Sequence, residues 1–164
     1  TQMALAFILT TPRIPQVYYG TELLMENSAK PGDHGLIRSD FPGGWEGDLR
    51  NGFTGAGLTS QEKEMQLFLR KILKFRQRSP AIHKGETLHF VPEDGVYILA
   101  RSLKDETVVL VLNKNEGPVT VPLSRYAELG LSGKPMNEIL SGKTVIWSGS
   151  LTLKEPGAYI YTTE

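Results

Sequence analysis

Short runs of β-forming residues recur about every ten residues between residues 81 and 164, a spacing typical of an all-β sandwich or barrel. Turn sequences separate the runs, among them Pro92–Gly95 and Lys114–Gly117. Thr107–Asn113 is apolar on both faces, which predicts a central strand. We therefore expect strands near residues 86–91, 96–102, 107–113, 118–123, 136–140, 143–147, 151–154 and 158–163.

Residues 59–79 carry the clearest helical pattern of the chain. Thr59 followed by Glu62 predicts a capping box at the start, and Ser79-Pro80 predicts the end. Basic residues crowd the last turns, where cations oppose the negative end of the helix dipole. The apolar face consists of Met65, Phe68, Leu69, Ile72 and Phe75.

Residues 1–22 predict a helix followed by a strand. The apolar run Met3–Leu9 predicts the helix, and Pro12 ends it. Ile14–Gly20 has the composition of a strand buried on both faces, as in a parallel sheet. Such a strand needs neighbours on both sides, and no further strand pattern appears before residue 59. We expect those neighbours upstream of Thr1, in a longer protein from which this chain is cut.

The segment 23–60 is rich in glycine but also contains aromatic residues. Nine of the 17 glycines fall between Gly20 and Gly57, together with Phe41, Trp45 and Phe53. Loops of this length are either functional or disordered. The aromatic residues favour an ordered binding loop.

Composition excludes several classes of function. The 18 basic and 18 acidic residues cancel, so nothing favours nucleic acid or an anionic membrane as a partner. No apolar run is long enough to predict a membrane span. The absence of cysteine excludes a disulfide scaffold, a thiolate nucleophile and a cysteine-ligated metal.

No catalytic constellation stands out from spacing alone. The three histidines are scattered, so they predict no metal site, and no G-x-S-x-G elbow is present. The aromatic residues of the loop could stack on sugars or fill a core. No spacing singles out an acid–base pair among the carboxylates Glu22, Asp33, Asp40, Glu46 and Asp48.

Two segments resemble one enzyme family. Ile14–Glu22 (IPQVYYGTE) resembles the strand-eight signature of the alpha-amylase superfamily, glycoside hydrolase family 13, with Arg13 in place of the family's glycine. Asp33–Trp45 (DHGLIRSDFPGGW) resembles the neopullulanase and cyclomaltodextrinase branch. The resemblance implies an α+β fragment: residues 1–80 are the end of a (β/α)8 barrel (helix seven, strand eight, a long loop and helix eight). Residues 81–164 are then an antiparallel β-sandwich C-terminal domain.

The resemblance also implies what the chain lacks. The family's catalytic carboxylates follow earlier barrel strands, and no Asn-His-Asp motif occurs here. We therefore expect no catalytic residue, no metal ligand and no cofactor in this chain, which we predict to be inactive alone. Whether the missing part of the barrel binds calcium is left open. The parent would be a retaining glycosidase that hydrolyses maltodextrin, cyclomaltodextrin or pullulan.

Barrel active sites lie at the carboxyl ends of the strands, where strand eight and its loop would reach. We therefore expect the rim of a glucan cleft at Tyr19, Glu22, Arg38, Asp40 and Trp45. An ion pair between Arg38 and Asp40 is a purely structural alternative.

A non-catalytic sandwich that binds starch or supports the barrel is the rival interpretation. It requires an exposed aromatic pair among Trp147, Tyr97, Tyr159 and Tyr161, although their strand positions favour a core role. The resemblance suggests a periplasmic or secreted parent. An unpaired apolar strand also predicts self-association of the isolated chain.

Overall fold

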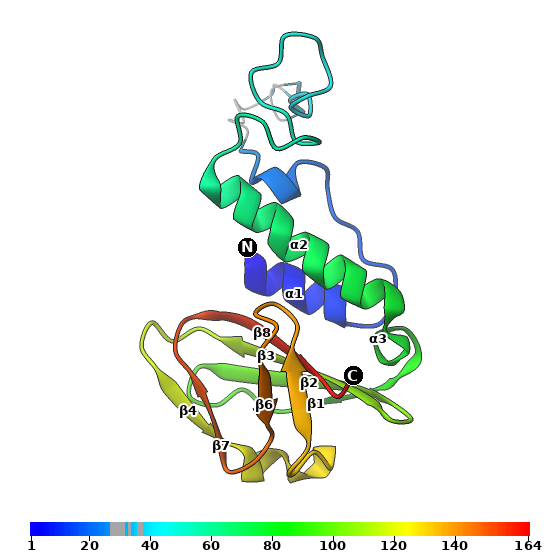
Figure 1. The fold of residues 1–164 in the computed structure, drawn as a ribbon, viewed down its shortest axis with the longest axis vertical. Coiled ribbons are helices and arrows are strands. Elements are labelled where there is room, and N and C mark those ends of the chain that lie inside the picture. The colour runs from blue at the N-terminus through cyan, green and yellow to red at the C-terminus, as the bar shows by residue number, and fades with distance from the viewer. Residues whose placement is uncertain (27–31, 33, 36–37) are drawn as a thin grey trace. The chain divides into compact units, whose positions relative to one another are not determined.

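The computed structural model describes residues 1–26, 32, 34–35 and 38–164 (Figure 1). Their contacts form two compact units, one of Thr1–Pro15 with Lys71–Glu164 and one of Gln16–Arg70. The helices are α1 (Gln2–Thr10), α2 (Ser60–Arg78) and α3 (Pro80–Lys84), with 3-10 helices η1 (Thr21–Leu23) and η2 (Leu123–Leu129). The strands are β1 (Glu86–His89), β2 (Val96–Leu103), β3 (Glu106–Asn113), β4 (Val119–Pro122), β5 (Pro135–Glu138), β6 (Thr144–Ile146), β7 (Ser150–Leu153) and β8 (Gly157–Thr162).

All eight strands predicted between residues 81 and 164 form, and every pairing is antiparallel. Six strands make one sheet in the order β1-β2-β3-β8-β5-β6, and β4 pairs with β7 in a second sheet. The apolar strand β3 lies between β2 and β8, as its two apolar faces predict. This region therefore has the all-antiparallel architecture expected from the spacing of its turns.

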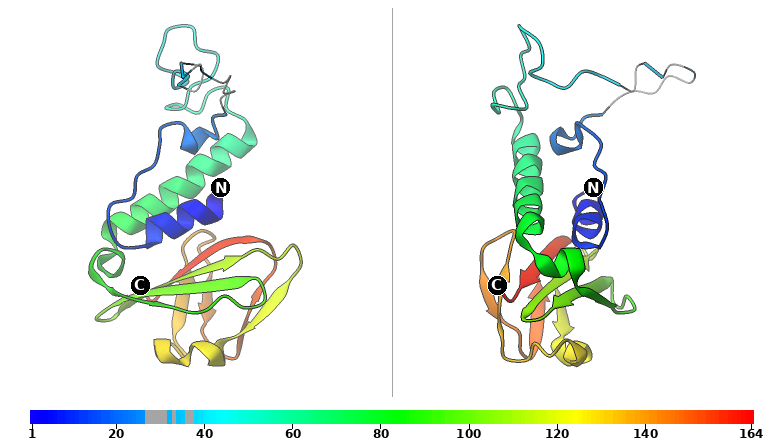
Figure 2. Two further views of the ribbon diagram at one scale, coloured as in Figure 1. Left: turned by 180° about the vertical axis from the view of Figure 1, so that it is seen from behind. Right: turned by 90° about the vertical axis from the view of Figure 1, so that its right-hand side faces the viewer.

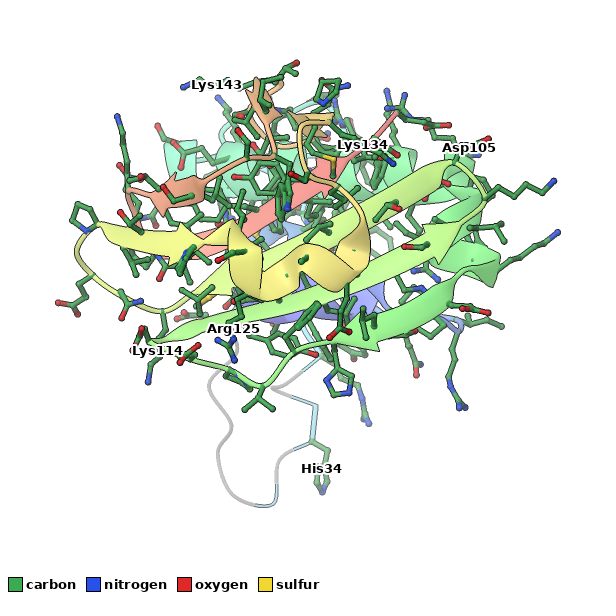
Figure 3. All side chains as sticks on the ribbon, turned by 90° about the horizontal axis from the view of Figure 1, so that it is seen from below. His34, Asp105, Lys114, Arg125, Lys134 and Lys143 are labelled. Atoms are coloured by element: carbon green, nitrogen blue, oxygen red, sulfur yellow. The ribbon has the colours of Figure 1, made fainter. Side chains whose placement is uncertain are left out.

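Alternation along the strands divides the buried side chains between two faces of the large sheet. One face forms a core with the second sheet and η2, containing Val109, Val111, Leu153 and Trp147. The side chains between them, Val108 and Leu110, are also buried, on the other face. Helix α1 contacts β3 and β8 on the large sheet (Figure 2). In Figure 3, η2 lies across the strands on the side away from α1.

Helix α2 begins with the predicted capping box. Thr59 N donates to Glu62 Oε2 at 2.7 Å, and Glu62 N donates to Thr59 Oγ1 at 3.3 Å. The predicted apolar face, Met65, Phe68, Leu69, Ile72 and Phe75, is buried. Helix α2 ends at Arg78, next to the predicted end at Ser79-Pro80. Ser79 then caps the short helix α3. Sequence reasoning missed α3 and η2.

The strand predicted over Ile14–Gly20 is wrong for this chain. That segment contains no strand, and the Ile14 side chain is 96% exposed. A parallel strand depends on neighbours for its hydrogen bonds, and none pairs with this segment among the described residues. The barrel end assigned to residues 1–80, and its boundary with residues 81–164, stay predictions. Among the described residues, no helix is long and apolar enough to cross a membrane.

Candidate functional site

The unit Gln16–Arg70 contains the residues expected at a glucan cleft. Gly20 adopts a left-handed conformation (φ 83°) and begins the turn into η1. This φ strains any residue with a Cβ, and a Cβ here would also lie 2.4 Å from the sulfur of Met25, so the turn favours glycine. The turn leaves Tyr18 59% and Tyr19 43% exposed, with ring centroids 4.7 Å apart. Two adjacent aromatic rings are thus presented to solvent before η1.

Trp45 is exposed and yet held in place by two carboxylates. Its side chain is 68% exposed. Asp48 Oδ2 accepts hydrogen bonds from Gly43 N at 2.7 Å and Trp45 N at 3.2 Å, which closes the turn around Trp45. The indole Nε1 donates to Asp40 Oδ2 at 3.2 Å. An exposed ring whose polar edge is already bonded offers its flat faces to a ligand.

Tyr19 and Asp40, twenty-one positions apart, lie close together. The Tyr19 hydroxyl donates to the Ser39 carbonyl at 3.0 Å. Desolvation raises the pKa of the Tyr19 phenol, Tyr18 and the negative charge of Asp40 raise it further, and Arg38 opposes them. Tyr19 is therefore neutral at ordinary pH and can donate or accept hydrogen bonds with sugar hydroxyls.

The rest of the loop is anchored within the same unit. Asn51 Oδ1 accepts from Phe53 N and Thr54 N, both at 2.9 Å, and Gln66 Nε2 on α2 donates to the Gly52 carbonyl at 2.8 Å. Arg50 forms an ion pair with Glu62. The described part of the loop is therefore anchored by hydrogen bonds and an ion pair, and its role as a binding loop stays a prediction.

Two predicted site residues make no hydrogen bond to this cluster among the described residues, although the charge of Arg38 acts on Tyr19. Glu22 lies in η1 and makes no side-chain hydrogen bond with the described residues. Arg38 is exposed and forms no ion pair with Asp40, so the structural alternative for this pair is not observed. Asp33 and Ile37 of the loop motif lie outside the described residues. The structure brings together Tyr19, Asp40 and Trp45, with the charge of Arg38 acting on Tyr19.

Sequence reasoning missed the structural roles of Asp48, Asn51 and Gln66. Asp48 was weighed only as a catalytic group, although an Asp three residues after Trp45 in a glycine-rich turn is a signal for side-chain capping of backbone N–H groups. The described residues contain no group of three or more His, Cys, Asp or Glu side chains arranged to hold a metal ion.

The other unit fixes the chain just before this segment. Arg76, only 7% exposed, donates to the carbonyl of Leu9 at 2.7 Å and that of Thr11 at 3.0 Å, and also to the carbonyl of Arg13. These bonds satisfy carbonyls at the end of α1. Burial lowers the pKa of Arg76. Arg13 has a φ of 91°, the conformation that favours glycine.

The aromatic residues of the strand-rich region do not provide the exposed pair that the rival interpretation needs. Trp147 is 2% and Tyr161 4% exposed, with ring centroids 5.6 Å apart in an edge-to-face arrangement. Tyr97 and Tyr159 are half-buried. The core role favoured by their strand positions is confirmed for Trp147 and Tyr161.

Known proteins with similar sequences include enzymes named alpha-amylase and cyclomaltodextrin glucanotransferase. Residues 87–162 match the cyclo-malto-dextrinase C-terminal domain. A maltogenic alpha-amylase of Bacillus acidopullulyticus is 26% identical over 121 residues, which cover 71% of this chain and 18% of the relative. A cyclomaltodextrin glucanotransferase of Paenibacillus macerans is 25% identical over 148 residues, which cover 88% of this chain and 18% of the relative. The chain thus spans less than a fifth of either relative.

Solved structures show the same fold. One is an alpha-amylase of Geobacillus thermoleovorans solved with acarbose, which superimposes with a TM-score of 0.70 and 23% identity. The match covers 98% of this chain and 32% of the amylase chain. Another is a cyclic alpha-maltosyl-(1→6)-maltose hydrolase of Arthrobacter globiformis, with a TM-score of 0.65 and 17% identity. The match covers 99% of this chain and 30% of the hydrolase chain. Residues 87–162 are therefore similar to the cyclo-malto-dextrinase C-terminal domain, and the chain is similar to parts of enzymes named maltogenic alpha-amylase and cyclomaltodextrin glucanotransferase.

Proposed function

We propose that this chain is the C-terminal part of a retaining α-glucan hydrolase and supplies an aromatic wall of its substrate cleft. The relatives named above, a maltogenic amylase and a glucanotransferase, support this assignment. The observation that carries it is Trp45, an exposed indole fixed by Asp40 and Asp48. The substrates would be maltodextrin, cyclomaltodextrin or pullulan.

The chain's own residues bind and orient in this proposal. The apolar face of a glucose ring stacks on Trp45, whose position is fixed before the sugar arrives, so little ordering entropy is lost on binding. Tyr18 and Tyr19 extend the aromatic surface, and the Tyr19 hydroxyl and the Asp40 carboxylate can bond sugar hydroxyls. Glu22 and Arg38 remain proposed members of the same rim.

Bond cleavage falls to carboxylates of the parent enzyme. A retaining glycosidase uses one carboxylate as nucleophile and a second as acid and base, through a covalent glycosyl-enzyme. The residue pattern assigns neither role to this chain. We expect no release of glucose or maltose when the chain is incubated with maltotriose, as measured by chromatography of the products. Hydrolysis would contradict this part of the proposal.

Binding at the loop can be tested separately. The indole N–H resonance of Trp45 is followed by NMR while maltotriose, and then β-cyclodextrin, is added to the chain. We expect a saturable shift. Trp45→Ala, whose affinity is measured by calorimetry because the variant lacks this resonance, should weaken binding about tenfold, since stacking of a ring on an aromatic side chain contributes on the order of 1–3 kcal/mol.

Leu49→Ala is the matched control for this experiment. Leu49 belongs to the same loop and is 94% exposed, but it offers no aromatic ring. Its substitution should leave glucan affinity unchanged. Equal losses in the two variants, or an unshifted Trp45 resonance at millimolar sugar, would remove Trp45 from the proposed cleft.

A further inference from the structure

The sequence contains one Asn-Gly pair, Asn51-Gly52, and it lies in the loop that precedes α2. An asparagine side chain can cyclise onto the backbone nitrogen of the next residue. Glycine favours this reaction, because it has no Cβ to hinder the close approach of that nitrogen. Both residues are only half-buried, so water reaches them. The pair is therefore a candidate site of modification that needs no enzyme.

The side-chain carbonyl of Asn51 is polarised by two backbone donors. Its Oδ1 accepts hydrogen bonds from Phe53 N and Thr54 N, both at 2.9 Å. Two N–H groups on one carbonyl oxygen draw electron density from the carbonyl carbon. They also stabilise the negative charge that the oxygen gains when a nucleophile attacks that carbon. The electrophile of a cyclisation is thus activated in the folded loop.

The nucleophile, the backbone nitrogen of Gly52, is held away from this reaction. Its N–H donates to the Pro42 carbonyl at 2.9 Å, and the Gly52 carbonyl accepts from Gln66 Nε2 on α2 at 2.8 Å. The backbone of Asn51 is fixed as well, since its N–H donates to the Ala56 carbonyl at 2.8 Å. Attack requires the Gly52 nitrogen to lose its proton and its peptide plane to rotate, and these bonds oppose both changes.

We propose that Asn51 is a site of spontaneous deamidation that the folded loop keeps closed and that opens when Gly52 leaves the Pro42 carbonyl. The Gly52 nitrogen forms a bond to the side-chain carbonyl carbon of Asn51, and the bond from that carbon to Nδ2 breaks. Ammonia leaves with the proton that Gly52 gives up, and a cyclic succinimide remains. Water then opens the ring at either carbonyl, which gives aspartate or isoaspartate. The proposal is independent of glucan binding.

The two products have different effects on the loop. Aspartate keeps an oxygen that can accept from Phe53 N and Thr54 N. Isoaspartate instead routes the main chain through the former side chain, so this acceptor is displaced. Asn51 also packs closely against Gly43, where a Cβ would lie 2.5 Å from the Asn51 side-chain carbon. Isoaspartate should therefore release both N–H groups and the contact with the Gly43 turn.

Peptide mass spectrometry tests the closed and open states. The chain is incubated at mildly alkaline pH, once in buffer and once in urea, and conversion of Asn51 is followed over time. We expect conversion in urea to be at least about tenfold faster, because the folded chain reacts only after local opening. Gly52→Ala should suppress conversion in urea. That comparison is made in urea because a Cβ at Gly52 would lie 2.6 Å from the Phe41 ring in the folded chain.

A variant on α2 connects the rate to the loop's own contacts. Gln66→Ala removes the bond to the Gly52 carbonyl and should speed conversion in buffer about fivefold, the effect of one lost neutral hydrogen bond. Gln77→Ala, at an exposed glutamine of the same helix, is the matched control and should leave the rate unchanged. In urea, Gln66→Ala and wild type should react equally fast.

Hydrogen exchange identifies the consequence for the loop. The amides of Phe53 and Thr54 should lose protection in the isoaspartate fraction and keep it in Asn51→Asp. Equal protection in both would overturn the proposed release of the loop. Absence of conversion at Asn51 in urea would overturn the site itself. Equal rates in buffer and urea, or an unchanged rate in buffer for Gln66→Ala, would overturn its control by the folded loop.

Discussion

The two tryptophans are held in opposite ways. Trp147 is 2% exposed and packs edge to face on Tyr161 within a large apolar core. Trp45 is 68% exposed and is held by hydrogen bonds to two carboxylates. Burial of apolar area stabilises the strand-rich region, whereas side-chain to backbone hydrogen bonds hold the described loop residues between Phe41 and Thr59. The first region is built for stability, and the second presents side chains to solvent.

The strongest test of this contrast removes a core side chain. Leu153 on β7 is fully buried in the core cluster. Leu153→Ala should lower the free energy of unfolding by about 2–5 kcal/mol, because the cavity left behind adds to the lost transfer energy. Urea unfolding measures this as a lower midpoint at unchanged slope. Leu49→Ala should cost under about 0.5 kcal/mol, and equal costs would contradict the contrast.

Alkaline pH should destabilise the strand-rich region. Burial, followed by the charge of Glu138 and the neighbouring Tyr159, raises the pKa of Tyr161 above its ordinary value of 10.0. The folded state therefore keeps this proton to higher pH than the unfolded state. The contribution of this proton to the free energy of unfolding is complete below pH 10 and is lost as the pH rises through the folded-state pKa. The free energy of unfolding should fall by at most about 1.4 kcal/mol per pH unit.

Tyr161→Phe tests this dependence, since phenylalanine keeps the ring and removes the proton. The difference in unfolding free energy between wild type and variant should shrink or reverse above pH 10. Tyr97→Phe is the comparison: burial also raises the pKa of Tyr97, but this side chain is only half-buried. A constant difference for Tyr161→Phe from pH 8 to 12 would contradict the prediction.

At the start of the exposed segment, Arg13 offers a gain in stability. Its φ of 91° costs an L-residue about 1–2 kcal/mol, and glycine avoids this cost. Glycine also has more conformational freedom in the unfolded state, which cancels part of the gain. Arg13→Gly should therefore raise the free energy of unfolding by about 0.5–1 kcal/mol in thermal or urea unfolding. Arg13→Ala keeps the Cβ and should show no such gain. Destabilisation by Arg13→Gly would show that the arginine side chain itself stabilises the fold.

The smallest expected effect concerns association rather than folding. Ile14 is 96% exposed and precedes the exposed Tyr18 and Tyr19 by four and five positions in sequence. We predict concentration-dependent self-association of the chain in sedimentation velocity. Ile14→Asp should weaken it with little change in stability, whereas Gln16→Asp adds the same charge at an exposed polar position and should not. Monomeric sedimentation at high concentration would refute this prediction.

The elements found from sequence are those whose signal is local. The eight strand bounds agree within two residues, because turn residues and alternating burial are both visible in the sequence. The capping box of α2 was equally readable from Thr59 and Glu62. Helix α3 was missed because Ser79-Pro80 was interpreted only as a stop, although an N-cap serine before proline also starts a helix.

The errors arise where a residue depends on distant partners. Ile14–Gly20 has strand composition, yet a strand forms only beside a neighbour, and none pairs with it among the described residues. In the candidate site, the aromatic residues were recognised by type. The bonds from Trp45 to Asp40 and from Tyr19 to the Ser39 carbonyl join positions whose separation carries no periodic signal. Spacing alone therefore could not distinguish Asp40 from Glu22.

The strand order of the large sheet has a consequence for biosynthesis. Strand β8 lies between β3 and β5, although it follows all the other strands in the chain. Until the ribosome has released Gly157–Thr162, the hairpins β1-β2-β3 and β5-β6 each expose an unpaired edge. The sheet therefore closes only after translation of this strand, by long-range contacts that form slowly, and the two edges are open to wrong pairing until then.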